Sequence, residues 1–335
     1  MPSNEERRAA AREKLARQNE QRAAEARKRK VIGISAGAVV VVVLVAAGCY
    51  LWLPQGPRGP LRVAAEHRFA STHTNCTFAD QPNQVQQVAK AITQGTAQLA
   101  KLPADQKPAM ELQIKQLTDA QPALQKMADF NKTVAKPNGT DVPNTGTVDG
   151  SFDTTAGTVD FTLDRSWAPC NVATVTQLIN GKYYDGTQCF RETAADPKAG
   201  SKLSVLQCGD RSNSGLGGPS WTSPDEIPTQ LKAAPNAQAS MAGPTVIYPA
   251  GTIAIANTGQ PNSGASQFFM VYADTELPAS YATVGTVSPA GLKVLQAIAA
   301  KGIKPSPYKP APAKGAAVTD GVPGETVTIT KATLS

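Results

Sequence analysis

The chain has 335 residues, of which 41% are hydrophobic and 18% charged, and its formal net charge is +7. This apolar content excludes a wholly disordered chain and predicts at least one domain with a buried core. The basic excess lies in residues 1–30, where ten Arg and Lys accompany five Glu, so the rest is nearly neutral and a nucleic-acid-binding domain is excluded.

Residues 31–53 form an apolar run without a charged side chain. At about 1.5 Å per residue such a helix spans a bilayer core of roughly 30 Å, so the run predicts a transmembrane helix. The basic residues 1–30 precede it, which predicts a cytoplasmic N-terminus and an extracytoplasmic remainder of a single-pass cell-membrane protein. The alternatives are a buried core helix, a cleaved signal peptide and lipidation of Cys49. The run continues to Trp52 beyond Cys49, which favours an uncleaved helix.

Residues 54–81 are predicted to be a linker, which starts with the proline-rich segment Pro54–Pro60. Apolar residues at three- and four-residue steps then predict a helical hairpin or stalk over 82–135, with Pro122 interrupting its second helix. This segment either packs on itself or serves as an arm that binds partners. Residues 136–147, rich in Pro, Gly, Asn and Thr, predict a second linker before a domain at 148–335.

Four cysteines lie beyond the apolar run, at positions 76, 170, 189 and 208. An even number of exported cysteines predicts two disulfides, for which three pairings are possible. The pair Cys189 and Cys208 is favoured, because these residues are expected on neighbouring strands. A metal site at His67, His73 and Cys76 is the alternative, which their loose spacing disfavours, and no metal or other cofactor is expected.

The domain at 148–335 has a different pattern from the helical segment. Strands are predicted at 157–163, 203–207, 252–256, 268–272 and 281–287, and helices at 171–180 and 290–300. Many strands with two helices indicate a mainly β fold, a closed barrel capped by helices. Within it, the loop and strand from Asn257 to Phe269 combine amide and aromatic side chains, which suits peptide binding.

Several short motifs of this domain occur together in a fixed order. They are Tyr184-Asp185-Gly186-Thr187, Phe190-Arg191, Gln207-Cys208-Gly209-Asp210, Gly217-Gly218-Pro219, Ala256-Asn257 and Ser266-Gln267-Phe268-Phe269. In these motifs the domain resembles cyclophilin-type peptidyl-prolyl cis-trans isomerases, and the whole chain resembles the membrane-anchored cyclophilins of bacteria. The resemblance implies an eight-stranded closed β-barrel capped by two helices, preceded by the transmembrane helix and the helical segment.

The resemblance also implies the chemistry. Arg191 would donate a hydrogen bond to the prolyl nitrogen, and Gln207 would orient Arg191 as the second catalytic residue. Both histidines of the chain, at 67 and 73, precede the domain, which suits a reaction that makes and breaks no covalent bond and needs no base. The implied substrate-binding residues are Asn257, Gln267, Phe269, Val205, Leu277, Pro278 and Tyr281.

Three departures from the family pattern bear on activity. An extra loop at 192–202 follows Arg191, Leu203 or Ser204 replaces the phenylalanine of the pocket, and Leu277 stands where many members carry the tryptophan that binds cyclosporin. We therefore expect a shallower pocket and weak cyclosporin binding. The predicted function is isomerisation of X-Pro bonds in polypeptides that fold outside the cytoplasm. The alternative is a weakly active or inactive module that binds peptides as a chaperone.

Overall fold

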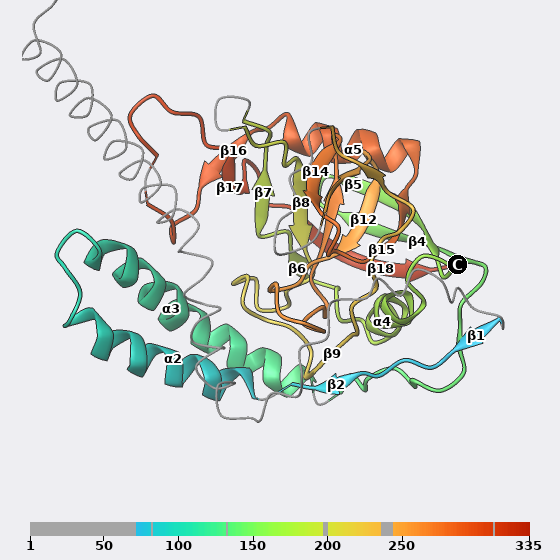
Figure 1. Cartoon of the computed structure of the whole chain (residues 1–335), viewed down its shortest axis with the longest axis horizontal. Helices are drawn as coiled ribbons and strands as arrows, with labels where there is room; N and C mark the ends of the chain where they lie inside the picture. Colours follow the sequence, from blue (N-terminus) through green and yellow to red (C-terminus); the bar gives the residue numbers. More distant parts are fainter. Residues whose placement is uncertain (1–71, 82, 132, 197–199, 236–243, 311) are drawn as a thin grey trace, which may run out of the picture. The chain divides into compact units, whose positions relative to one another are not determined.

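The computed structural model describes residues 72–81, 83–131, 133–196, 200–235, 244–310 and 312–335 (Figure 1). These residues all belong to one compact unit. The predicted cytoplasmic segment 1–30, the predicted transmembrane helix 31–53 and most of the linker 54–81 lie outside the described residues. Across the described ranges, no helix combines the length and apolar character needed to cross a membrane.

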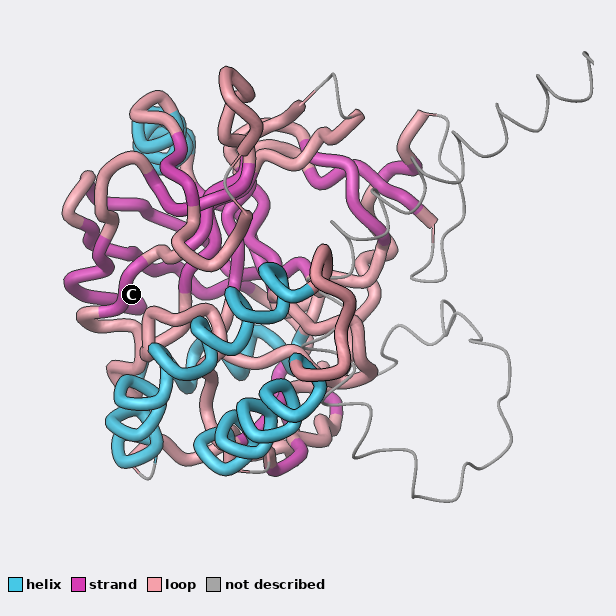
Figure 2. Tube along the Cα trace, turned by 90° about the vertical axis from the view of Figure 1, so that its left-hand side faces the viewer, coloured by secondary structure: helices cyan, strands magenta, loops and turns pink. Residues whose placement is uncertain are grey.

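The helical segment consists of α2 (Gln84–Leu99) and α3 (Lys107–Asn131), which lie side by side (Figure 2). The side chain of Asn83 caps α2 by accepting hydrogen bonds from the N–H groups of Val85 and Gln86. The helix α3 runs through Pro122, which the sequence predicted to interrupt it. A proline inside a helix removes one backbone hydrogen bond, but Ala120 and Leu124 on either side are buried, and this packing keeps the helix continuous.

Two disulfides join segments of the described chain. Cys76, which precedes α2, is bonded to Cys170 in α4 (Pro169–Asn180), and Cys189 is bonded to Cys208, as favoured from the sequence. Because Cys76 is oxidised, it is unavailable for the alternative metal site. Among the described residues, no group of three or more His, Cys, Asp and Glu is placed to hold a metal ion.

A large sheet of eleven strands forms the main body of the domain. Its spatial order is β16-β17-β7-β8-β13-β12-β15-β5-β4-β18-β6. In chain order the strands are β4 (Thr147–Thr154), β5 (Gly157–Asp164), β6 (Thr187–Gln188), β7 (Arg191–Thr193), β8 (Val205–Cys208), β12 (Thr252–Ile255), β13 (Phe268–Val271), β15 (Thr283–Val287), β16 (Ile303–Pro305), β17 (Asp320–Pro323) and β18 (Thr328–Leu334). All of their pairings are antiparallel.

The sheet curls around its core. Phe152 on β4 and Phe268 on β13 are four strands apart, which in a flat sheet would separate them by about 19 Å. Their rings instead stack with centroids 5.0 Å apart. The helices α4 and α5 (Pro289–Ala299) cover opposite ends of the curled sheet (Figure 1) and contribute buried side chains such as Leu178 and Leu295 to the same core.

The mainly β architecture with two covering helices is confirmed, and the curled sheet has eleven strands where the sequence predicted a barrel of eight. In the described chain its hydrogen-bonded order ends at β16 on one side and at β6 on the other. β6 and β7 are separated only by Cys189 and Phe190, whose N–H groups donate to the Val327 and Gln207 carbonyls, so this stretch of chain pairs with β18 at its start and with β8 at its end. The segment between α5 and β18 adds β16 and β17 beside β7.

Three smaller sheets complete the fold. The first consists of β10 (Lys232–Ala233), β11 (Thr245–Tyr248) and β14 (Thr275–Pro278). In the second, β1 (His73–Thr74) pairs with β3 (Val142–Pro143), and in the third, β2 (Ala79–Asp80) pairs with β9 (Trp221–Thr222). The strands β1, β2 and β3 lie in the two segments that the sequence predicted to be linkers. In addition, the Cys76 N–H donates to the Gly139 carbonyl at 2.8 Å, so both segments are bound into the domain.

Candidate active site

The register of three neighbouring strands places the principal predicted residues in one row. Arg191 on β7 lies opposite Gln207 on β8, and Gln207 lies opposite Phe269 on β13. Directly opposed residues of antiparallel strands present their side chains on the same face of the sheet. The structure therefore brings together a cation, an amide and an aromatic ring that are up to 78 positions apart in the sequence.

A chain of hydrogen bonds connects Arg191 to a glycine-rich loop. Arg191 Nη1 donates to Gln207 Oε1 at 3.1 Å, and Gln207 Nε2 donates to Gln267 Oε1 at 3.0 Å. Gln267 Nε2 in turn donates to the carbonyl of Gly217 at 2.9 Å and to that of Gly215 at 3.2 Å. Each amide thus accepts on one side and donates on the other, so the guanidinium is fixed by a path that ends on backbone.

A carboxylate holds the other side of the guanidinium. Arg191 Nε donates to Asp320 Oδ1 at 2.9 Å, and Arg191 Nη2 donates to Asp320 Oδ2 at 3.1 Å. Lys309 Nζ forms a further ion pair with Asp320 Oδ2 at 2.6 Å. Burial alone would raise the pKa of Asp320, but hydrogen bonds and charge from Arg191 and Lys309 outweigh it and lower this pKa below its usual value.

An apolar cluster lies on the same face as Arg191. Phe269 is 5% exposed, and its ring meets the ring of Tyr281 nearly edge-on, at 83° and 5.5 Å between centroids. Val205 and Leu277, which the resemblance implied as residues of the proline pocket, pack into the same cluster. Burial raises the pKa of the Tyr281 phenol, and the positive charge of Arg191 partly offsets this rise.

Two further predicted residues lie beside this cluster. Pro278 ends β14, and its carbonyl accepts a hydrogen bond from the Tyr248 hydroxyl at 3.1 Å. Asn257 follows β12, and its Nδ2 donates to the Ser280 carbonyl at 2.8 Å. Asn257 is therefore held to the loop that carries Tyr281 rather than to the hydrogen-bonded chain of Arg191.

The opposite face of the same strands points into the core. Glu192 lies opposite Leu206 on β8, and Leu206 lies opposite Met270 on β13, so the Glu192 side chain lies in an apolar row. Glu192 is 1% exposed, and neither of its carboxylate oxygens has a hydrogen-bond partner in the structure as described. Burial raises its pKa to about 7.

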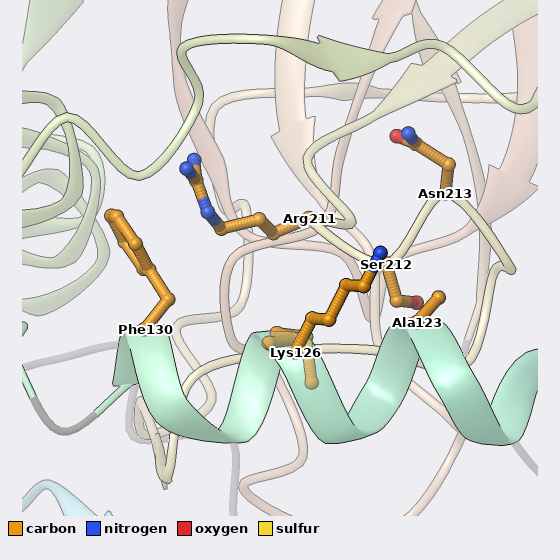
Figure 3. A pocket seen from close by; sticks show the side chains of 7 residues that line it. Ala123, Lys126, Phe130, Arg211, Ser212 and Asn213 are labelled. Carbon is orange, nitrogen blue, oxygen red and sulfur yellow. The ribbon is translucent and has the colours of Figure 1, made fainter.

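A cavity of about 320 Å³ lies between α3 and the loop after β8 (Figure 3). Its lining includes Lys126 and Phe130 of α3 and residues 211–213. The Arg211 guanidinium lies over the Phe130 ring at 3.5 Å, and its Nη1 donates to the Tyr183 carbonyl at 2.7 Å. None of the predicted site residues lines this cavity, so its position does not coincide with the Arg191 face.

Comparison with known proteins decides the family. Residues 150–333 match the family model of the cyclophilin type peptidyl-prolyl cis-trans isomerases. The chain belongs to the cyclophilin family. A protein of Mycobacterium leprae described as "Probable peptidyl-prolyl cis-trans isomerase B" is 35% identical over 304 residues, which are 90% of this chain and 93% of that protein. This cyclophilin is therefore a peptidyl-prolyl cis-trans isomerase by family.

Two further similarities are more limited in extent. A Mycobacterium tuberculosis protein of the same description is 37% identical over 204 residues, 61% of this cyclophilin and 60% of that protein. Among solved structures, a cyclophilin type peptidyl-prolyl cis-trans isomerase of Cryptosporidium parvum is 21% identical, covers 57% of this chain and 98% of its own, and has a TM-score of 0.39.

The structure adds residues that the sequence reasoning missed. Asp320 and Lys309 contact the guanidinium network, Tyr248 supports the loop of Tyr281, and Glu192 lies under the site on the core face. The sequence predicted that an extra loop begins at Glu192, but β7 continues to Thr193 and places the Glu192 carboxylate on the core face. No local pattern marked Asp320, which is 129 positions from Arg191.

Proposed function

We propose that this cyclophilin isomerises X-Pro bonds by donating a hydrogen bond from Arg191 to the prolyl nitrogen. The observation that carries the proposal is the row of Arg191, Gln207 and Phe269, in which a fixed guanidinium lies beside an apolar cluster. A proline ring suits the apolar side of this row, and the peptide groups that flank it suit the polar side.

The physical basis is amide resonance. The planar prolyl amide keeps its nitrogen lone pair in conjugation, which accounts for a barrier of about 18 to 20 kcal/mol. When the bond twists, the lone pair leaves conjugation and can accept a hydrogen bond. A donor that is already fixed by Gln207 and its neighbours stabilises the twisted state more than the planar one, and this lowers the barrier without any base or nucleophile.

We further propose that Phe269, Tyr281, Val205 and Leu277 receive the proline side chain. Phe269 and Val205 are buried and Leu277 and Tyr281 are half-buried, so a ring can lie on the cluster without opening the core. Pro278 and Asn257 lie on the rim, where a backbone group of Asn257 can bind the residue before proline. The replacement of Trp by Leu277 supports weak binding of cyclosporin.

The proposed clients are X-Pro-containing polypeptides outside the cytoplasm, with residues 31–53 as a single-pass membrane anchor. Two disulfides support an oxidising compartment, because such bonds are rare in the cytosol. The apolar run preceded by basic residues supports the anchor and its orientation.

The test is the rate of cis-to-trans conversion of an X-Pro peptide by the full chain in detergent. Arg191→Ala is expected to lower kcat/KM by about a hundredfold or more, as is typical when a transition-state donor is lost. Arg165→Ala is the matched control, because the Arg165 guanidinium donates to the Thr147 carbonyl, which lies outside the site. Equal rates for wild type and Arg191→Ala would contradict the proposal and favour a peptide-binding module without catalysis.

A further inference from the structure

We infer that Asp320 is a positioning residue, which holds the Arg191 guanidinium in the orientation that catalysis requires. The inference rests on the proposed role of Arg191. It concerns the segment between α5 and β18, which contributes both Asp320 and Lys309 to the site.

A count of donors shows what Asp320 does to the guanidinium. Arg191 has five N–H donors, of which Nε and one on Nη2 bind Asp320 and one on Nη1 binds Gln207. The two that remain, one on Nη1 and one on Nη2, bind no other residue in the part of the chain that the structure describes and are the donors available to a substrate. Because Asp320 binds side-on through two oxygens, it fixes the plane of the guanidinium and hence the direction of these two donors.

The strands fix Asp320 in turn. Asp320 begins β17 and lies opposite Thr193 of β7, so backbone pairing holds it beside the strand that carries Arg191. Lys309 binds the Asp320 oxygen that Arg191 Nη2 also contacts. The Tyr308 ring next to it lies 5.9 Å from Lys115 Nζ of α3. The carboxylate is therefore supported from the sheet and from the segment before it.

Exposure distinguishes this role from one in stability. The side chains of Arg191 and Asp320 are 36% and 37% exposed, and ion pairs at that exposure contribute little to the free energy of unfolding. Removing the carboxylate should therefore leave the fold intact while freeing the guanidinium to rotate. The prolyl nitrogen accepts a hydrogen bond only in the twisted state, so the effect should appear in kcat rather than in KM.

The experiment compares Asp320→Asn with wild type in the full chain, using peptide exchange NMR to separate kcat from KM. We expect kcat to fall by between about ten- and a hundredfold, as for a catalytic group misplaced by about 1 Å, with KM changed by less than about twofold. Lys309→Met should lower kcat less, because both hydrogen bonds from Arg191 to Asp320 remain. Glu325→Gln is the matched control, because Glu325 lies five positions from Asp320 in an exposed ion pair with Lys301.

A second measurement tests positioning directly. The Arg191 Nε–H signal should exchange with water faster in Asp320→Asn than in wild type, while the thermal midpoint stays within about 2 °C. Unchanged kcat in Asp320→Asn would overturn the inference, and so would a rise in kcat, which would mean that Asp320 competes with the substrate. If Arg191→Ala is inactive while Asp320→Asn equals wild type, the proposed function stands and only this inference fails.

Discussion

The buried carboxyl of Glu192 provides a quantitative test of the structure. Its pKa is raised to about 7 by burial, from 4.5 for an accessible glutamate. A difference of 2.5 in pKa corresponds to at most about 3.5 kcal/mol, since each pKa unit is worth about 1.4 kcal/mol. The charge of Glu192 also affects Tyr272: the pKa of this phenol is raised to about 12, first by burial and then by the negative charge of Glu192.

The sign of the effect follows from linkage. The folded state binds the Glu192 proton more tightly than the unfolded state, so the favourable contribution is complete below about pH 4.5 and is lost as the pH rises through about 7. Glu192→Gln carries no charge at any pH and should not show this loss. From pH 4.5 to pH 8, the free energy of unfolding of Glu192→Gln should therefore rise relative to wild type by up to about 3 kcal/mol.

The assay is urea unfolding at several pH values, followed by the fluorescence of tryptophan, including Trp221, which is 2% exposed. An amide in the same place leaves donors without partners, which costs about 1–3 kcal/mol but does so equally at every pH. The difference between pH values is thus the informative quantity. Glu111→Gln on the exposed surface of α3 is the control and should show no such trend. If the difference in the free energy of unfolding between wild type and Glu192→Gln stays constant from pH 4.5 to pH 8, the carboxyl at this position is not desolvated and the reasoning is refuted.

Two further predictions concern the disulfides and the pocket. Replacing Cys76 and Cys170 by Ser should lower the free energy of unfolding by about 5 kcal/mol, because this bond joins residues 94 positions apart. Replacing Cys189 and Cys208 by Ser should lower it by about 3 kcal/mol, because these residues are 19 positions apart. Urea unfolding of the two double variants should show this order, and the reverse order would contradict the prediction. Leu277→Trp should tighten cyclosporin binding at least tenfold in calorimetry, and an unchanged dissociation constant would mean that Leu277 does not line the inhibitor site.

Local pattern was enough to predict much of the domain. Alternation at 157–163 corresponds to β5 (Gly157–Asp164), and the apolar run at 268–272 corresponds to β13 (Phe268–Val271). Both elements owe their form to side chains that the strand itself places on a buried face. The site residues Arg191 and Gln207 were also predictable, because each lies in a short sequence motif, and the two motifs fall on the paired strands β7 and β8.

Features that depend on distant segments could not be predicted in this way. The pairing of Asp320 with Arg191 requires β17 to lie beside β7, and neither strand is long enough to carry a pattern. Continuity of α3 through Pro122 depends on packing of α3 with other parts of the chain, which local propensity does not contain. In both cases the deciding energy comes from contacts made only after the chain has folded.

The contacts of α3 change how a chaperone role for the helical segment has to be tested. Asn131 Nδ2 donates to the Gly218 carbonyl at 2.9 Å, and Gln116 Nε2 donates to the Ser214 carbonyl at 3.3 Å. These carbonyls belong to the same loop whose Gly215 and Gly217 carbonyls accept from Gln267. Deleting residues 82–130 would therefore disturb the support of Gln267 together with any client-binding surface, and loss of client protection after such a deletion would not separate the two roles. Substitutions of exposed residues of α2, which leave the contacts of α3 in place, do separate them.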